Sequence, residues 1–170
     1  PVYPIIPWFD YRTDPQIGWW REHVGFDATA AVCGVMPHPM FGMPKLMWIR
    51  DNEPEAYAAG RHWLNVGDYA EFRLCGSLTT DYSLASRTLV LDLVGRRWSA
   101  ELLDAINIRP GLLAELVPAG TQVGVLHDEA ADATGLPTGL PIVRGGQDHV
   151  CAALALGISE PGAILDSIGT

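Results

Sequence analysis

The sequence predicts an α/β fold, because short apolar runs typical of β-strands alternate along the chain with stretches of helical periodicity. The strand-like runs are Leu89 to Leu93, Gln122 to Leu126 and Pro141 to Val143. Turn residues separate them from stretches that carry helix caps or glycine stops. With 170 residues, the chain is long enough to form one domain with a hydrophobic core.

Capping residues and glycine stops indicate where the helices lie. Asp14 is expected to cap the first helix, with Pro15 in its first turn and Gly25 at its end. Asp128 is expected to cap a helix that Gly135 stops. The other helices are expected over residues 27–33, from Pro44 onward, over 54–59, over 66–74 with a break at Gly67, over 99–106 behind a Ser99 cap, over 110–116 and over 150–156.

The N-terminal segment Pro4 to Arg12 is expected to be a short strand with proline punctuation. In such a strand Trp8, Asp10 and Arg12 would point to one face. An aromatic ring can pack on the C–H face of a polyol while the two charged groups bind its hydroxyls. The same residues also allow a purely structural interpretation, a salt-bridged strand end beside a core Trp.

Asp148 lies where the last strand-like run passes through two glycines into an alanine-rich helix. The carboxyl end of a strand in an α/β sheet is where such folds place their ligand crevice, and a helix N-terminus favours an ionised carboxylate. Asp148 is therefore a candidate general base. The alternative is that Asp148 is only a helix N-cap, since Asp is one of the preferred capping residues.

Composition and charge exclude several classes of protein. The net charge is −9, and the 11 basic residues are scattered, which argues against a nucleic-acid partner. No apolar run is long enough to span a bilayer, so no membrane partner is expected. Cys33, Cys75 and Cys151 lack the spacing of a zinc site or a disulfide framework, which favours a reducing, cytoplasmic location and no protein-bound metal.

Several motifs resemble those of the FGGY carbohydrate kinases. In chain order these are Trp8-x-Asp10-x-Arg12-Thr13, Lys45-x-x-Trp48, Thr80-Asp-Tyr-Ser-Leu-Ala-Ser-Arg-Thr88, Gly145-Gly-Gln-Asp-His149 and Ser167-Ile-Gly-Thr170. The third motif departs from the family pattern at one position, where Leu84 replaces the usual Asn. Its role in the family is architectural, so Asp81 and Arg87 are not expected to form a catalytic pair.

The resemblance implies an incomplete ribonuclease H-like (actin-like ATPase) domain that is part of a two-domain sugar kinase. Residues 1–160 would belong to the N-terminal sugar-binding domain, and residues 161–170 would begin the ATP-binding domain. The chain opens without Met and stops where that second domain has only begun, so it is expected to be a fragment that is inactive alone.

The resemblance also implies a reaction, the ATP-dependent phosphorylation of a sugar or polyol hydroxyl, with Asp148 as the general base and Mg²⁺ bridging the phosphates. The implied substrate-binding residues are Trp8, Asp10, Tyr11, Arg12, Met40, Gln147 and His149. Gly169 and Thr170 would contact nucleotide phosphate. Tyr11, Met40 and His149 differ from the pattern of glycerol kinases, which argues against glycerol as the substrate.

Two other classes of function stay open at this point. The chain could be a non-catalytic, sugar-binding relative of the family. Asp148 could instead pair with Asp10 in a glycoside hydrolase, provided that the two carboxylates face one cleft at a set separation. The sequence does not decide the oligomeric state, and a homodimer is left open.

Overall fold

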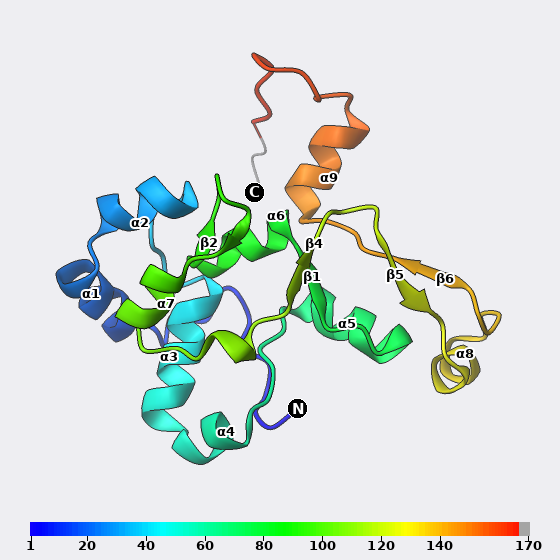
Figure 1. The fold of residues 1–170 in the computed structure, drawn as a ribbon, viewed down its shortest axis with the longest axis horizontal. Coiled ribbons are helices and arrows are strands. Elements are labelled where there is room, and N and C mark those ends of the chain that lie inside the picture. Colours follow the sequence, from blue (N-terminus) through cyan, green and yellow to red (C-terminus); the bar gives the residue numbers. More distant parts are fainter. Residues whose placement is uncertain (167–170) are drawn as a thin grey trace.

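The computed structural model describes residues 1–166 as a mixture of helices and short strands (Figure 1). The helices are α1 (Asp14–His23), α2 (Phe26–Cys33), α3 (Gly42–Asn52), α4 (Pro54–Ala59), α5 (Val66–Cys75), α6 (Tyr82–Ala85), α7 (Ala100–Ala105), α8 (Asp128–Thr134) and α9 (Asp148–Ala155), with 3₁₀ turns at Ser86–Thr88 and Pro110–Leu112. The strands are β1 (Thr79–Asp81), β2 (Leu91–Asp92), β3 (Arg97–Trp98), β4 (Glu115–Val117), β5 (Gln122–Val125) and β6 (Pro141–Val143). The α/β class is thereby confirmed.

The strands form three separate pairs. β1 and β4 are parallel, with Thr79 opposite Glu115 and Asp81 opposite Val117. β2 pairs with β3, and β5 pairs with β6, both in the antiparallel sense. Two parallel strands need a crossover connection between them. Between β1 and β4 this connection contains α6, the β2–β3 hairpin and α7.

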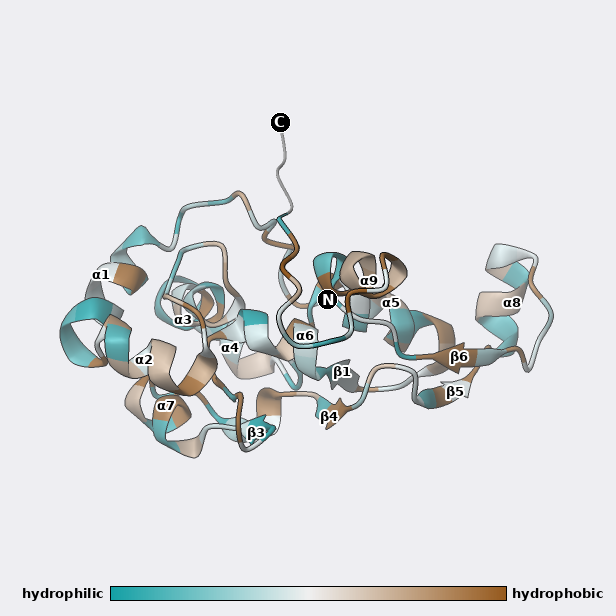
Figure 2. Ribbon diagram, turned by 90° about the horizontal axis from the view of Figure 1, so that it is seen from above, coloured by the Kyte–Doolittle hydropathy of each residue, from teal (hydrophilic) through white to brown (hydrophobic). Residues whose placement is uncertain are grey.

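The main core lies at one end of the elongated molecule, where α1, α2, α3 and α7 gather (Figure 2). Trp20 of α1, Met43 of α3 and Leu89 are fully buried there. The Trp20 indole donates a hydrogen bond to Thr29 Oγ1 at 2.8 Å, so the polar atom of this buried ring is satisfied. This core fixes α3, which in turn carries the Lys45-x-x-Trp48 motif.

The β5–β6 ribbon and α8 form the other end of the molecule (Figure 2). A small cluster of Leu126, Ala130 and Ala131 packs there against Leu74 of α5 and Ile142 of β6. Between the two ends, α9 projects from the body of the protein (Figure 1), and none of its residues is buried.

The predicted helices at 54–59 and 27–33 are confirmed, and the helix expected at 66–74 is α5. Gly67 does not break α5 as expected, because it lies in the first turn, behind a capping box of Asn65 and Asp68. Ser99 caps α7 as predicted, accepting a hydrogen bond from Leu102 N at 3.3 Å. Gly135 ends α8 in the left-handed conformation.

The strand expected over residues 4–12 is wrong. Pro4 and Pro7 have no N–H group for a ladder, and Asp10 N donates to Pro7 O at 3.2 Å, which closes a turn. Asp10 Oδ1 then accepts a hydrogen bond from Arg12 N at 3.0 Å. The local hydrogen bonds of Asp10 thus replace those of a strand.

The helix expected over 110–116 is also wrong beyond its first turn. After Leu112 the chain becomes β4, and Glu115 N donates to Leu78 O at 3.0 Å beside β1. Pairing with a distant strand overrides the local helical pattern here. The strand β1 itself was not predicted.

Five helix starts, those of α1, α2, α3, α8 and α9, differ from the prediction by one or two residues. The helix α2 begins at Phe26, and α9 begins at Asp148. Asp14 and Asp128 are the first residues of α1 and α8 rather than their caps, and His127 Nδ1 accepts the hydrogen bond of Ala130 N at 3.1 Å. An acidic side chain in the first turn still interacts favourably with the helix dipole. The helix α3 begins at Gly42 rather than at Pro44.

Candidate active site

Asp148 is the first residue of α9, and its side chain is 83% exposed. Its Oδ1 atom accepts hydrogen bonds from His149 N at 2.8 Å and from Gln147 Nε2. His149 Nε2 lies 3.8 Å from the same oxygen. The carboxylate is therefore oriented by its two sequence neighbours while it stays open to a ligand.

Gln147 occupies the N-cap position of α9. Its Oε1 atom accepts a hydrogen bond from Val150 N at 3.2 Å. The alternative in which Asp148 is only a cap does not fit this geometry, because the capping role belongs to Gln147. Asp148 is left free of that role.

The turn before α9 is anchored to the Thr80–Thr88 motif. Gln147 N donates a hydrogen bond to Ser83 Oγ at 2.8 Å, and Ser83 Oγ donates in turn to Asp81 Oδ2. Asp81 also accepts from Ser83 N at 2.6 Å and from Leu84 N at 3.3 Å. A Cβ atom at position 146 would stand 3.2 Å from Ser83 Oγ, so a larger residue there would have to displace the hydroxyl that anchors the turn.

These contacts place the Asp148 turn beside the carboxyl end of β1, the strand that ends at Asp81 and pairs in parallel with β4. The sequence led us to expect the turn at the end of its own strand, β6, in an α/β sheet. β6 is instead half of an antiparallel ribbon. The parallel strand whose carboxyl end lies at the turn is β1. The carboxyl ends of parallel strands are where α/β folds bind ligands.

The second group of predicted residues surrounds a bidentate ion pair. Arg12 Nε and Nη2 donate to Asp10 at 3.0 and 2.7 Å, and Arg12 Nη1 donates to Tyr3 Oη at 3.2 Å. The guanidinium stacks 4.8 Å from the ring centroid of Trp48. Hydrogen bonds from Arg12 lower the pKa of the Asp10 carboxyl to about 2.

Lys45 of α3 holds this group to the loop that carries Met40. Its buried Nζ donates to Pro7 O at 2.8 Å and to Met40 O at 3.1 Å. Burial lowers the pKa of the Lys45 ammonium. Because two hydrogen bonds from one ammonium reach two separate segments, Lys45 fixes the distance between the Trp8 segment and the Met40 loop.

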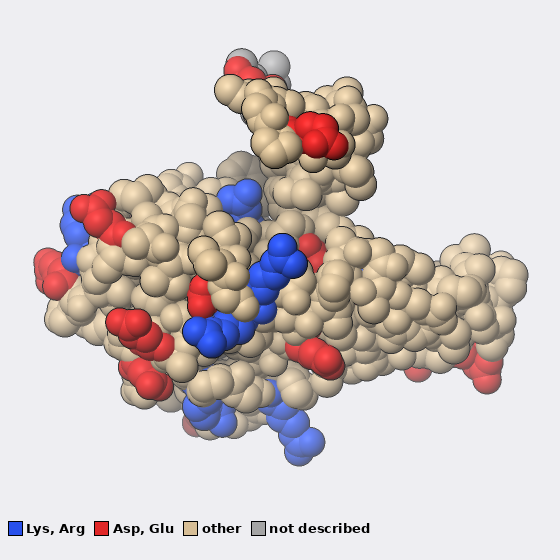
Figure 3. Space-filling model, turned by 45° about the horizontal axis from the view of Figure 1, so that its top comes forward, with Lys and Arg blue, Asp and Glu red and all other residues tan. Residues whose placement is uncertain are grey.

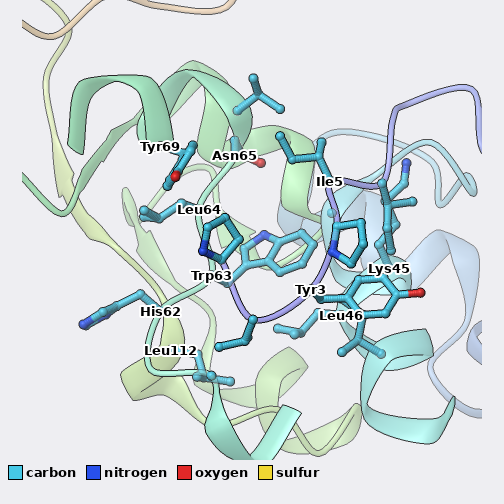
Figure 4. A pocket seen from close by; sticks show the side chains of 18 of the residues that line it. Tyr3, Ile5, Lys45, Leu46, His62, Trp63, Leu64, Asn65, Tyr69 and Leu112 are labelled. Carbon is cyan, nitrogen blue, oxygen red and sulfur yellow. The ribbon is translucent and has the colours of Figure 1, made fainter. Parts of the chain in front are cut away.

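A cavity of about 620 Å³ opens beside Lys45, between the N-terminal segment, α3 and the chain from Gly60 to Val66. Trp8 and Met40 are among the residues that line it, and the Trp63 indole lies in the middle of the lining side chains (Figure 4). Most of this lining is hydrocarbon. A polyol needs hydrogen-bond partners for its hydroxyls, so the interior of this cavity is not assigned as the sugar site.

The structure thus brings the predicted site residues together in two groups. Gln147, Asp148 and His149 form one, anchored on Ser83. The other contains Trp8, Asp10, Tyr11, Arg12 and Met40, around Lys45 and Trp48. Within residues 1–166, no hydrogen bond or ion pair joins Asp148 to Asp10 or Arg12. The predicted phosphate contacts Gly169 and Thr170 lie outside the described residues.

Basic and acidic side chains are interspersed on the face shown in Figure 3, where the α9 segment rises above the body. In the part of the chain that the structure describes, no group of three or more His, Cys, Asp or Glu side chains could hold a metal ion. No helix among those residues is long and apolar enough to cross a membrane. All three cysteines are free, but only Cys33 is buried as expected, whereas Cys151 is exposed.

Sequence reasoning missed the roles of Ser83 and Lys45. The Ser83 hydroxyl accepts a hydrogen bond from Gln147 N, 64 positions away in the sequence. No sequence signal marks such a distant partner. Lys45 had a signal, since a lysine between Pro44 and Leu46 in an apolar stretch must bury its stem and find acceptors for its charge.

Comparison with known proteins gives this site a context. The sequence matches the N-terminal domain of the FGGY family of carbohydrate kinases over residues 1–155. It is 32% identical over its whole length to a xylulose kinase of Lactococcus lactis, covering 34% of that protein. It is 31% identical over 166 residues to an L-fuculokinase of Escherichia coli, covering 98% of this chain and 35% of that protein.

A solved structure shows the same fold. The xylulose kinase from Rhodospirillum rubrum superposes with a TM-score of 0.82 and 32% identity, over 89% of this chain and 31% of that one. The fold is thus part of the ribonuclease H-like, actin-like ATPase architecture found in sugar kinases. The chain belongs to the FGGY family of carbohydrate kinases. It spans about a third of the length of the curated relatives that it matches.

Proposed function

We propose that the protein containing this chain transfers the γ-phosphoryl group of ATP to a hydroxyl of a sugar or polyol, with Asp148 as the general base. The observation that carries the proposal is the exposed Asp148 carboxylate, oriented by hydrogen bonds at the start of α9 beside the carboxyl end of β1. Membership of a carbohydrate kinase family supports it.

In this reaction Asp148 accepts the proton of the attacking hydroxyl as its oxygen forms a bond to the γ-phosphorus, and ADP leaves. Phosphoryl transfer asks the protein chiefly for positioning and charge neutralisation, so a fixed, solvent-open carboxylate is suited to the task. Mg²⁺ bound to ATP would neutralise phosphate charge. Mg²⁺ is usually held by substrate phosphates and one or two carboxylates.

The sugar would lie between the two groups of site residues. Trp8, 65% exposed, and Tyr11 offer aromatic faces for its C–H surface, and the outer atoms of the Asp10–Arg12 pair offer hydrogen bonds. Met40, in the loop to which Lys45 is hydrogen-bonded, would contact the sugar. Gln147 and His149 would bind the hydroxyls next to the reacting hydroxyl. Tyr11, Met40 and His149 disfavour glycerol, and the xylulose and fuculose kinases among the relatives support a ketose or a similar sugar.

Residues 1–160 would form most of the sugar-binding domain, and residues 161–170 would open the ATP-binding domain, where Gly169 and Thr170 would contact phosphate. Glycine permits the close approach of backbone N–H groups that phosphate binding uses. Because the chain covers about a third of its relatives, we infer that residues 1–170 alone do not turn over. The location we propose is cytoplasmic, and a homodimer stays open.

The test is ATP consumption by the complete protein against a panel of pentuloses, 6-deoxyketohexoses, aldohexoses, tetritols, gluconate and glycerol. We expect turnover with one sugar and little or none with glycerol. Sugar binding by calorimetry without ATP consumption for any compound would contradict the kinase proposal. That result would favour the non-catalytic, sugar-binding relative.

The hydrolase alternative receives no support from Asp10. A glycosidase pair needs one carboxyl group that is protonated at working pH, with a raised pKa. The two-point contact with Arg12 lowers the pKa of Asp10 instead, so Asp10 is unsuited to the role of general acid.

A further inference from the structure

Arg144 is a buried arginine between β6 and the Gly145–Gly146 turn that leads to Asp148. Its side chain is 3% exposed, and its two carboxylate partners are 1% and 8% exposed. Arg144 Nη2 donates to Asp68 Oδ1 at 2.7 Å, and Nη1 donates to Glu71 Oε1 at 2.8 Å. Both acids come from α5, far from the Asp148 turn in sequence.

The partners of Arg144 are themselves held in place. Asp68 Oδ2 accepts hydrogen bonds from Asn65 N at 3.0 Å and Asn65 Nδ2 at 2.9 Å, in the capping box of α5. Glu71 Oε1 also accepts from Thr79 Oγ1 at 2.9 Å. The carboxylates therefore cannot turn away from Arg144 without breaking further bonds, which makes the guanidinium position specific.

Such a cluster is a poor way to gain stability alone. Removing three charged groups from water costs a large desolvation penalty, and apolar side chains of similar volume often serve stability equally well. Burial raises the pKa of the Asp68 carboxyl even though the charge of Arg144 opposes the rise. The directional bonds of the cluster point instead to a role in fixing a backbone position.

The backbone that Arg144 fixes lies next to the proposed base. Nη1 of Arg144 also donates to Thr79 O of β1 at 3.0 Å. Its main-chain N donates to Thr121 O, and its O accepts from Gly120 N, both at 2.8 Å. Residues 145 and 146 are glycines without side chains to restrain them, so the direction of the turn depends on its anchors at Arg144 and at Gln147.

We propose that Arg144 is a positioning residue for Asp148, acting through its buried bonds to Asp68 and Glu71. The guanidinium ties the start of the glycine turn to α5 and β1, while the Ser83–Gln147 bond ties its end to the carboxyl end of β1. With both of its ends fixed, at Arg144 and at Gln147, the glycine turn holds the Asp148 side chain in one orientation. The kinetic consequence rests on the proposed function, whereas the structural consequence does not.

The first experiment measures amide hydrogen exchange of the complete protein by mass spectrometry, with peptides covering residues 145–156. In Arg144→Met we expect exchange at least tenfold faster in this segment, with peptides from α1 and α3 unchanged. The matched control is Arg73→Met, which removes an exposed arginine of α5, the helix that carries Asp68 and Glu71; Arg73 pairs with Glu129 at 3.6 Å. Unchanged exchange over 145–156 in Arg144→Met would overturn the proposal.

The second experiment separates positioning from stability. A misplacement of about 1 Å in a catalytic group can cost about 10²-fold in rate. We therefore expect Arg144→Met to lower kcat by about 10²-fold while the sugar KM stays within threefold. Arg144→Lys, which keeps the charge but lacks the two-pronged geometry, should lower kcat less and is the variant to use if Arg144→Met does not fold.

The third variant combines Arg144→Met with Asp68→Asn and Glu71→Gln. Without buried charges, its thermal midpoint should recover toward that of the wild type, while kcat stays low. Recovery of kcat together with the midpoint would show a merely structural role and contradict the proposal. If the wild-type protein consumes no ATP, the proposed function fails, and the exchange experiment still decides whether Arg144 fixes the turn.

Discussion

At the scale of single residues, burial gives identical side chains different chemistry. Cys33 is buried in the main core, and Cys151 is exposed on α9. Burial, with a smaller effect from Asp92, raises the pKa of the Cys33 thiol to about 12. A thiol reacts as its thiolate, so Cys33 should be inert in the folded protein at neutral pH.

This leads to a prediction on pH. The pKa of Cys33 is higher in the folded than in the unfolded state, so its contribution to stability is complete below about pH 9 and is lost as the pH rises toward 12. Unfolding free energies of the wild type and of Cys33→Ala, measured between pH 7 and 11, should converge above pH 9. A constant difference across that range would contradict the pKa shift.

Asp148 shows what a single residue in a sequence could and could not reveal. Its place between an apolar run and a helix was predictable, because β6 and α9 are local elements with clear patterns. One of the two interpretations of Asp148 made it the N-cap of α9, and this was wrong. Asp and Gln at adjacent positions can both accept hydrogen bonds from the first N–H groups of a helix, so the sequence did not distinguish them. Only the geometry distinguishes Gln147 as the cap.

At the scale of elements, local signals predicted most helices and the strands β2, β5 and β6, but they missed β1, β3 and β4. Helix α5 has its capping box of Asn65 and Asp68 and its C-terminal Gly76 within one short stretch of sequence. β1 and β4 are three residues each and exist because they pair with one another across 36 positions, which no local pattern contains. For the N-terminal segment the local pattern was misleading. The alternation of Trp8, Asp10 and Arg12 indicated a strand, but the prolines and Asp10 form turns there.

The start of α7 gives a test at this scale. Ser99 adopts an extended conformation and caps the helix through Leu102 N. Replacing a capping Ser by Ala costs typically about 1 kcal/mol, and replacing it by Gly only a few tenths. We expect Ser99→Ala to lower the unfolding free energy by about 1 kcal/mol in urea titrations and Ser99→Gly to lower it less. Equal losses in both variants would show that packing, rather than the cap, determines the effect.

At the scale of the whole molecule, the two groups of site residues are fixed by different parts of the fold. Lys45 and the main core position the Trp8–Arg12 group, whereas Ser83, β1 and Arg144 position the Asp148 turn. The sequence predicted the members of each group through motifs. It could not predict the anchors between α5, β1 and the turn, because those bonds join residues more than 60 positions apart.

The central claim is that Asp148 is the base of a sugar kinase, and Asp148→Asn tests it most directly. Asn keeps the size of the side chain and an oxygen that can accept from His149 N, but it cannot take a proton from a hydroxyl. The matched control is Asp128→Asn, because Asp128 is likewise the exposed first residue of a helix, α8, which lies at one end of the molecule away from α9.

The measurement is kcat in the complete protein with the sugar that the panel identifies, together with sugar affinity by calorimetry. We predict that Asp148→Asn lowers kcat by about 10²- to 10⁴-fold, the usual contribution of a general base, with sugar affinity within a few fold. Asp128→Asn should leave both unchanged. Turnover of Asp148→Asn within a few fold of the wild type would contradict the account.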